Sequence, residues 1–72
     1  MPPLKKEILF GRNVRRLREA LGLSIAELAF RAGMTPPAIS QIETGKRDPQ
    51  LRSVIQISEA LGCRLTKLLE PL

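Results

Sequence analysis

Histidine, tryptophan and tyrosine are absent from this sequence of 72 residues, and cysteine occurs once, as Cys63. Without histidine, the serines lack an imidazole base for the nucleophile–base pair of a hydrolase. One cysteine without histidine cannot supply the usual zinc ligands, and it cannot form an intrachain disulfide. The sequence therefore predicts a protein that is not an enzyme, with no metal site and no cofactor.

Long apolar runs and targeting signals are also absent. No stretch approaches the ~20 apolar residues of a membrane span, and the N-terminus lacks a signal-peptide pattern. A single cysteine fits a reducing compartment, and Cys63 is expected to pack as a small apolar side chain. We expect a cytoplasmic protein without membrane contact.

Positive charge exceeds negative charge in this short chain. Twelve lysines and arginines against seven aspartates and glutamates give a net charge of +5, which suits a polyanionic partner. A chain of this length forms one domain that buries only about 60% of its unfolded surface, which leaves little core for a substrate pocket. We predict a flexible lead-in over residues 1–7 and a folded domain over residues 8–70.

Glycines and prolines divide the chain into short segments with helical spacing of apolar residues, and no segment alternates as a strand does. The pattern predicts a compact all-α fold of five helices, near residues 6–21, 25–32, 36–44, 51–61 and 65–69. Gly11 is a weak point in the first of these helices, because glycine destabilises a helix. The last two helices are expected to pack through Leu51, Val54, Ile55, Ser58, Leu61, Leu65, Leu68 and Leu69.

Residues 24–44 carry the signals of two short helices joined by a tight turn. Ser24 and Glu27 form a capping box that starts the first of them, and Gly33 allows the turn. Thr35 caps the second, with Pro36 at its first position. This arrangement is typical of a helix-turn-helix, formed by helices 2 and 3 of the chain.

The third helix has two different sides. At about 100° per residue, its inner side consists of Ala38, Ile39, Ile42 and Glu43. Its outer side is uncharged and consists of Pro36, Pro37, Ser40, Gln41 and Thr44. Such a helix can enter the DNA major groove.

Arg18 and Glu43 are charged residues on helix sides that should be buried. Because a lone buried charge costs several kcal/mol, each residue predicts the other as its partner in an ion pair. The alternative is that the Arg18 stem lies along apolar surface while its charged end reaches water. We favour the ion pair.

Several short runs occur together at fixed spacing: Gly22-Leu23-Ser24, Glu27-Leu28-Ala29, Ala32-Gly33, Ile39-Ser40-Gln41-Ile42-Glu43, Gly45-Lys46 and Pro49. With Arg18, they resemble the Cro/phage-repressor helix-turn-helix regulators, also called the xenobiotic-response-element type. The resemblance covers about residues 9–69. It implies a five-helix, lambda-repressor-like domain that binds double-stranded DNA and regulates transcription, as a repressor or an antitoxin-like autoregulator. Such proteins are usually homodimers on near-palindromic operators.

The resemblance also implies which residues contact DNA. Base contacts would come from Pro36, Pro37, Ser40 and Gln41. Phosphate contacts would come from the starts of helices 1 and 2, the end of helix 3 and the loop after it: Arg12, Asn13, Ser24, Ile25, Thr44, Lys46 and Arg47. A protein of this kind would be associated with the nucleoid when it is bound to DNA.

Two features depart from the family pattern. Ile25 stands where glutamine is frequent, which leaves only its backbone N–H for a phosphate. Pro36 and Pro37 replace side chains that hydrogen-bond to bases, and offer only apolar contact, for example to a thymine methyl. Hydrogen-bonded readout would therefore depend mainly on Gln41, which suits the N6 and N7 atoms of adenine.

Two alternatives stay open. One is a protein-interaction module that has kept the fold, with Phe30 and the leucines near the C-terminus as its contact surface. The other is the DNA-binding fragment of a longer ligand-sensing regulator. If the chain forms a homodimer, we expect contact through the end of helix 4 and residues 63–72.

Overall fold

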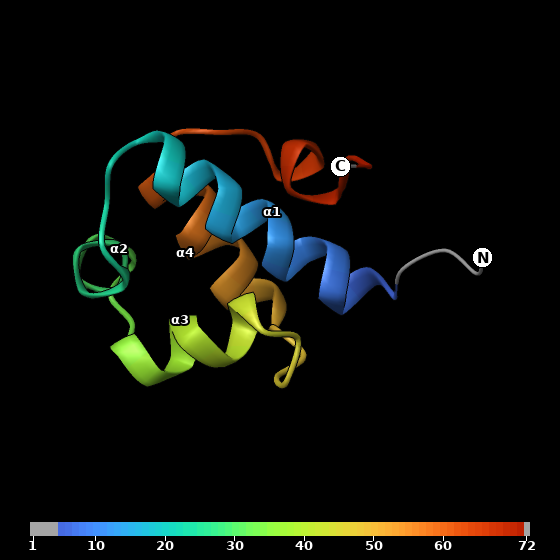
Figure 1. The fold of residues 1–72 in the computed structure, drawn as a ribbon, viewed down its shortest axis with the longest axis horizontal. Coiled ribbons are helices and arrows are strands. Elements are labelled where there is room, and N and C mark those ends of the chain that lie inside the picture. The colour runs from blue at the N-terminus through green and yellow to red at the C-terminus, as the bar shows by residue number, and fades with distance from the viewer. Residues whose placement is uncertain (1–4, 72) are drawn as a thin grey trace.

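The structure, a computed structural model, describes residues 5–71. Over these residues it contains four α-helices, one 3-10 helix and no strand (Figure 1). The elements are α1 (Lys6–Ala20), α2 (Ile25–Ala32), α3 (Pro36–Glu43), α4 (Leu51–Leu61) and the 3-10 helix η1 (Leu65–Leu69). The all-α prediction is confirmed for the described residues, whereas the last of the five expected helices is a 3-10 helix instead of an α-helix.

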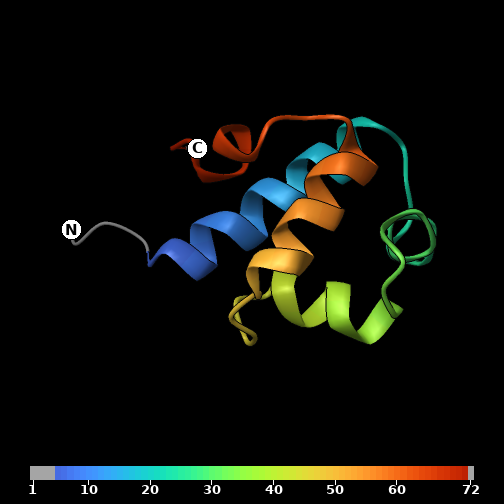
Figure 2. The same ribbon diagram turned by 180° about the vertical axis from the view of Figure 1, so that it is seen from behind.

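One helix, α1, lies at the centre and packs against α3, α4 and η1 (Figure 1 and Figure 2). The shorter α2 packs against α3 and α4. Each of the five elements contributes to a single apolar core. Its buried members are Phe10, Val14, Leu28, Ala29, Ala32, Ile39, Ile42, Ile57, Leu61 and Leu68.

The start of α2 and the turn after it form as the sequence predicts. The Glu27 backbone N–H donates to Ser24 Oγ, and the Ser24 N–H donates to the Glu27 carboxylate, each at 3.0 Å. The second of these bonds lowers the pKa of Glu27. After α2, Gly33 adopts φ +67°, and the Met34 N–H donates to the Ala29 carbonyl at 2.8 Å. The capping box fixes the start of α2, and the glycine sets the direction of α3 relative to α2.

The lead-in predicted over residues 1–7 is too long, because Lys6 and Glu7 already belong to α1. Residues 1–4 lie outside the described part of the chain. Within the described residues the first helix begins at Lys6, where the helix near residues 6–21 was expected to begin.

The predicted packing of α4 and η1 is partly wrong. Leu51 and Ile55 are 71% and 38% exposed, whereas Ile57 is fully buried. In η1, Leu68 is fully buried but Leu65 and Leu69 are 40% and 50% exposed. Helical spacing shows which apolar side chains share one side of a helix, but it does not show which other element packs against that side. Because α4 packs mainly against α2, its buried stripe is turned toward Ile57.

Gly11 lies at a close approach of two helices, where the sequence indicated only a weak point in α1. It is buried, and a Cβ atom on it would collide with the carbonyl oxygen of Ile42 and lie 2.9 Å from that of Glu43. The backbones of α1 and α3 can approach this closely only because position 11 has no side chain.

We predict that Gly11→Ala lowers the free energy of unfolding by about 2 kcal/mol or more, because the added methyl group forces α3 away from α1. At an open position inside a helix the same change would stabilise the protein by about 1 kcal/mol. A urea titration measures the effect. Gly22→Ala gives a comparison of a different kind: Gly22 has open space around it but φ +70°, so any loss there comes from backbone strain and not from a collision. A Gly11→Ala variant as stable as the original protein would contradict the close approach.

Candidate nucleic-acid interface

The outer side of α3 is exposed as predicted. Pro36, Pro37, Ser40 and Gln41 are exposed, and they form the strip that we call the α3 strip. On the opposite side, the residues that anchor the helix are buried: Ala38, Ile39, Ile42 and Glu43. Thr35 Oγ1 accepts the Ala38 N–H at 3.3 Å, so the prolines occupy the first two helical positions without loss of a backbone hydrogen bond.

Arg18 and Glu43 form the expected ion pair between α1 and the end of α3. Arg18 Nε and Nη2 donate to the two carboxylate oxygens at 2.7 and 3.0 Å. Arg18 Nη1 also donates to the Leu23 carbonyl at 2.8 Å. The side chains are only 11% and 5% exposed, and the hydrogen bonds that Arg18 donates to Glu43 raise the pKa of Arg18. One guanidinium therefore joins α1, the loop before α2, and α3.

Exposed basic residues follow α3 directly. Lys46 and Arg47 lie in the loop between α3 and α4, where the Lys46 N–H donates to the Gln41 carbonyl at 2.9 Å. Arg12 is exposed on α1, and it directly follows Gly11, where α1 and α3 approach closely. The ion pairs within residues 5–71 are Arg15–Glu19, Arg18–Glu43 and Lys67–Glu70, and none of them uses these three cations. Their charges are thus available to an anionic partner.

Arg52 is a basic residue that the sequence analysis did not select. With Arg47, it lines a groove of about 320 Å³ beside the start of α3, whose polar lining also includes Thr35, Ser53 and Gln56. The lining contains no carboxylate. Arg52 is the second residue of α4. A positive charge is unfavourable in the first turn of a helix, so the position of Arg52 is the sequence signal that could have selected it as a candidate.

Ser24 and Ile25 begin α2, but their side chains differ in what they can do. Ser24 Oγ accepts the Glu27 N–H and keeps its own proton for a further acceptor. The Ile25 side chain is partly buried and packs against the core, so only its backbone N–H remains for a phosphate, as the sequence indicates. The backbone N–H of Ile25 lies at the helix N-terminus, where N–H groups favour anions.

Thr44 and Asn13 are engaged within the protein. The Thr44 hydroxyl donates to the Ser40 carbonyl at 3.0 Å, which uses its proton. Asn13 is fully buried, and its Nδ2 donates to the carbonyls of Leu68 and Glu70, each at 2.8 Å. The predicted phosphate contact by Asn13 is therefore wrong: a side chain without exposed surface cannot reach a nucleic acid.

Other kinds of site find little support in the described residues. They contain no group of three or more histidine, cysteine, aspartate or glutamate side chains that could hold a metal ion. No helix among them has the length and apolarity to cross a membrane. Cys63 is partly buried between α4 and η1, and this burial raises the pKa of its thiol.

Comparison with known proteins agrees with this geometry. The helix-turn-helix family model matches residues 14–68, from the middle of α1 to η1. The chain belongs to the helix-turn-helix family. A relative within this family, the control protein C.BamHI of Bacillus amyloliquefaciens, is 38% identical over 64 residues, which are 88% of this chain and 79% of that protein. Other relatives are longer, and the chain spans 27% and 20% of two of them.

Solved structures of family members have the same arrangement of helices. The restriction-modification controller protein C.AhdI from Aeromonas hydrophila superposes with a TM-score of 0.84 and 32% identity, over 86% of this chain and 94% of that one. The P22 c2 repressor, in complex with a synthetic operator, superposes with a TM-score of 0.79 and 31% identity, over 85% and 92%. The chain is thus similar to these two proteins along nearly their whole solved length.

We predict that Glu43→Ala lowers the free energy of unfolding by about 3–5 kcal/mol, because it leaves the Arg18 charge buried without its partner. A denaturant titration measures this loss. Replacing both residues, as Arg18→Met with Glu43→Leu, should recover most of it because no buried charge remains. A loss within error of zero for Glu43→Ala would contradict the energetic role of the pair.

Proposed function

We propose that this chain is a DNA-binding transcriptional regulator that inserts α3 into the major groove of double-stranded DNA. The observation that carries the proposal is the exposed, uncharged α3 strip, flanked by cations without ion-pair partners in residues 5–71. A groove-facing surface that is small and uncharged, beside cations that meet phosphates, is what a helix-turn-helix needs. On this proposal the protein acts in the cytoplasm, at the nucleoid.

Within the α3 strip, Gln41 is the main reader of base identity. Its side-chain amide can donate a hydrogen bond to N7 of adenine and accept one from the N6 amino group of the same base. Ser40 is a secondary contact, and Pro36 and Pro37 meet apolar atoms such as a thymine methyl. Because few side chains of the α3 strip can form hydrogen bonds to bases, we expect modest sequence specificity. Much of the affinity would then come from contacts with phosphates.

Phosphate contacts surround this strip. We assign them to Arg12, Lys46 and Arg47, to the Ser24 hydroxyl and the Ile25 backbone N–H, and to Arg52 in the groove beside α3. Thr44 takes part only if its hydroxyl leaves the Ser40 carbonyl. Asn13 is not among them.

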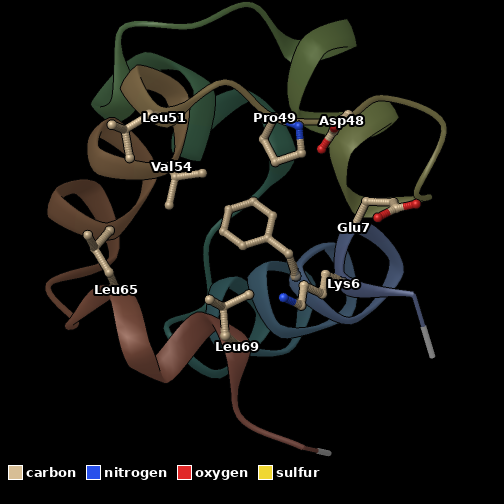
Figure 3. A pocket seen from close by; sticks show the side chains of 9 residues that line it. Lys6, Glu7, Asp48, Pro49, Leu51, Val54, Leu65 and Leu69 are labelled. Carbon is tan, nitrogen blue, oxygen red and sulfur yellow. The ribbon is translucent and has the colours of Figure 1, made fainter. Parts of the chain in front are cut away.

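A homodimer would associate through an exposed apolar surface, which we call the α4–η1 surface and which consists of Leu51, Ile55, Leu65 and Leu69. It borders an apolar groove of about 360 Å³, with Lys6, Glu7 and Asp48 at the rim (Figure 3). Charges of both signs at one rim suit a two-fold contact between copies. This surface shares residues 63–72 with the contact expected from the sequence, and adds the start of α4 in place of its end. The half-sites of an operator would then lie about 34 Å apart.

Gln41→Ala should relax base preference at one position of the bound sequence, at a cost of about 1–3 kcal/mol for sites with the preferred base there. Selection of bound duplexes from a random library, followed by titration of single-base variants, measures the change. An equal loss on every sequence would make Gln41 a residue that orients the protein without reading a base.

Lys46→Ala should weaken binding to all sequences alike and reduce the salt slope of the binding constant by about one unit, because one phosphate contact is lost. Titrations at several salt concentrations measure the slope. Lys67→Ala removes the same charge from η1, where it pairs with Glu70, and is the control when binding is measured on a single half-site, so that dimerisation does not contribute. An unchanged slope for Lys46→Ala would refute its phosphate contact.

Leu51→Glu should convert a dimer to a monomer without loss of fold, because Leu51 is 71% exposed. Analytical ultracentrifugation, with and without a selected duplex, measures the oligomeric state. Phe30→Glu places the same charge on an 87% exposed residue of α2 and serves as the control. A two-fold symmetric consensus from the library selection supports the dimer, whereas a protein that is monomeric both free and on DNA contradicts it.

Phe30 also favours a second candidate function, a protein-interaction module. Its 87% exposed ring lies on the outer side of α2, in a shallow groove with Ala26, Glu27 and Arg31. Failure to bind any duplex at low salt would make this candidate the leading one.

A further inference from the structure

Buried hydrogen bonds attach the end of the chain to the middle of α1. Asn13 Nδ2 donates to the Leu68 and Glu70 carbonyls, both at 2.8 Å, across more than fifty residues of sequence. Arg16 Nη2 donates to Asn13 Oδ1 at 3.2 Å, so both ends of the amide are used. Asn13 is the only fully buried polar side chain among the described residues.

The element that receives these bonds is weak by itself. It has five residues, 3-10 geometry and no side-chain cap. Short 3-10 helices have poor hydrogen-bond geometry and depend on their surroundings. Within η1, Leu68 is the one buried residue. The position of η1 on α1 therefore depends on the burial of Leu68 and on the two hydrogen bonds that Asn13 donates.

The two accepting carbonyls lie on either side of Leu69. That residue is half exposed, and with Leu65 it forms the η1 half of the α4–η1 surface (Figure 3). By fixing residues 68 and 70, the Asn13 amide fixes the backbone that carries the Leu69 side chain. The shape of the surface thus depends on a side chain that is not part of it.

We propose that Asn13 is a positioning residue, which holds the segment from Leu65 to Glu70 on α1 and thereby forms the surface for a second copy of this chain. The second part rests on the proposed homodimer. Asparagine suits this role because its amide supplies two N–H donors in one plane and an acceptor for Arg16. Aspartate has the same size, but its carboxylate would face two carbonyl oxygens without a proton to donate.

Cys63 provides a direct measurement of this attachment. It is the only cysteine of the sequence, it is partly buried, and it immediately precedes the segment. We expect release of η1 from α1 to expose this thiol further, while α1 to α4 stay folded. The rate of iodoacetamide labelling at pH 7.5 therefore reports this local opening, and circular dichroism reports the remaining helices.

The test compares Asn13→Asp and the milder Asn13→Ala with the control Ser58→Ala. Ser58 is also a buried polar residue, but its hydroxyl donates to the Ile55 carbonyl within α4. Loss of two neutral hydrogen bonds should raise the labelling rate of Cys63 and the dimer dissociation constant, each about 10- to 100-fold. Helix content and the salt slope of half-site binding should not change, since Asn13 contacts no phosphate. Ser58→Ala should leave labelling and dimerisation near the original values.

Labelling and dimerisation that are unchanged in both Asn13 variants would overturn the proposal. Faster labelling with an unchanged dimer would limit Asn13 to holding η1 and overturn its role in the surface. If the original protein is monomeric at every concentration, the proposed dimer itself fails, while the labelling rates still decide whether Asn13 holds the segment.

Discussion

The ion pair between Arg18 and Glu43 is the interaction on which the position of α3 depends. Because either charge alone would be costly to bury, the two side chains must meet, and they can meet only when α3 lies against α1. Gly11 brings the backbones close enough for this contact, and the Leu23 carbonyl adds the loop before α2 to it. The buried side of α3 is thereby fixed, and the α3 strip is left to face outward.

α1 supports two surfaces, the α3 strip and the α4–η1 surface. Toward one side it holds α3 through a charged pair, and toward the other it holds η1 through the Asn13 amide. A helix-turn-helix dimer needs both surfaces at a fixed separation, because two recognition helices must reach half-sites one helical turn apart. In the proposed homodimer, the central helix α1 would set that separation, because it anchors both surfaces.

The sequence predicted local structure well where the signal is chemical. The capping box at Ser24, the turn at Gly33 and the prolines that start α3 depend on few neighbouring residues, and all are present. The Arg18–Glu43 pair was also predictable, because two opposite charges on buried sides require each other. The failures were Asn13, Leu51 and Ile55, whose environment depends on segments that are distant along the chain.

The sequence by itself determined the helices, their caps, the helix-turn-helix and the uncharged outer side of α3. Each follows from helical periodicity or from hydrogen bonds within a few residues. Only the tertiary structure decided that Asn13 is buried, that Arg52 joins Arg47 in one groove, and that Leu51, Ile55, Leu65 and Leu69 remain uncovered. Periodicity shows that side chains share a face, but the helix that packs on that face comes from elsewhere in the chain. Burial is therefore a property of the assembled helices and cannot be assigned one helix at a time.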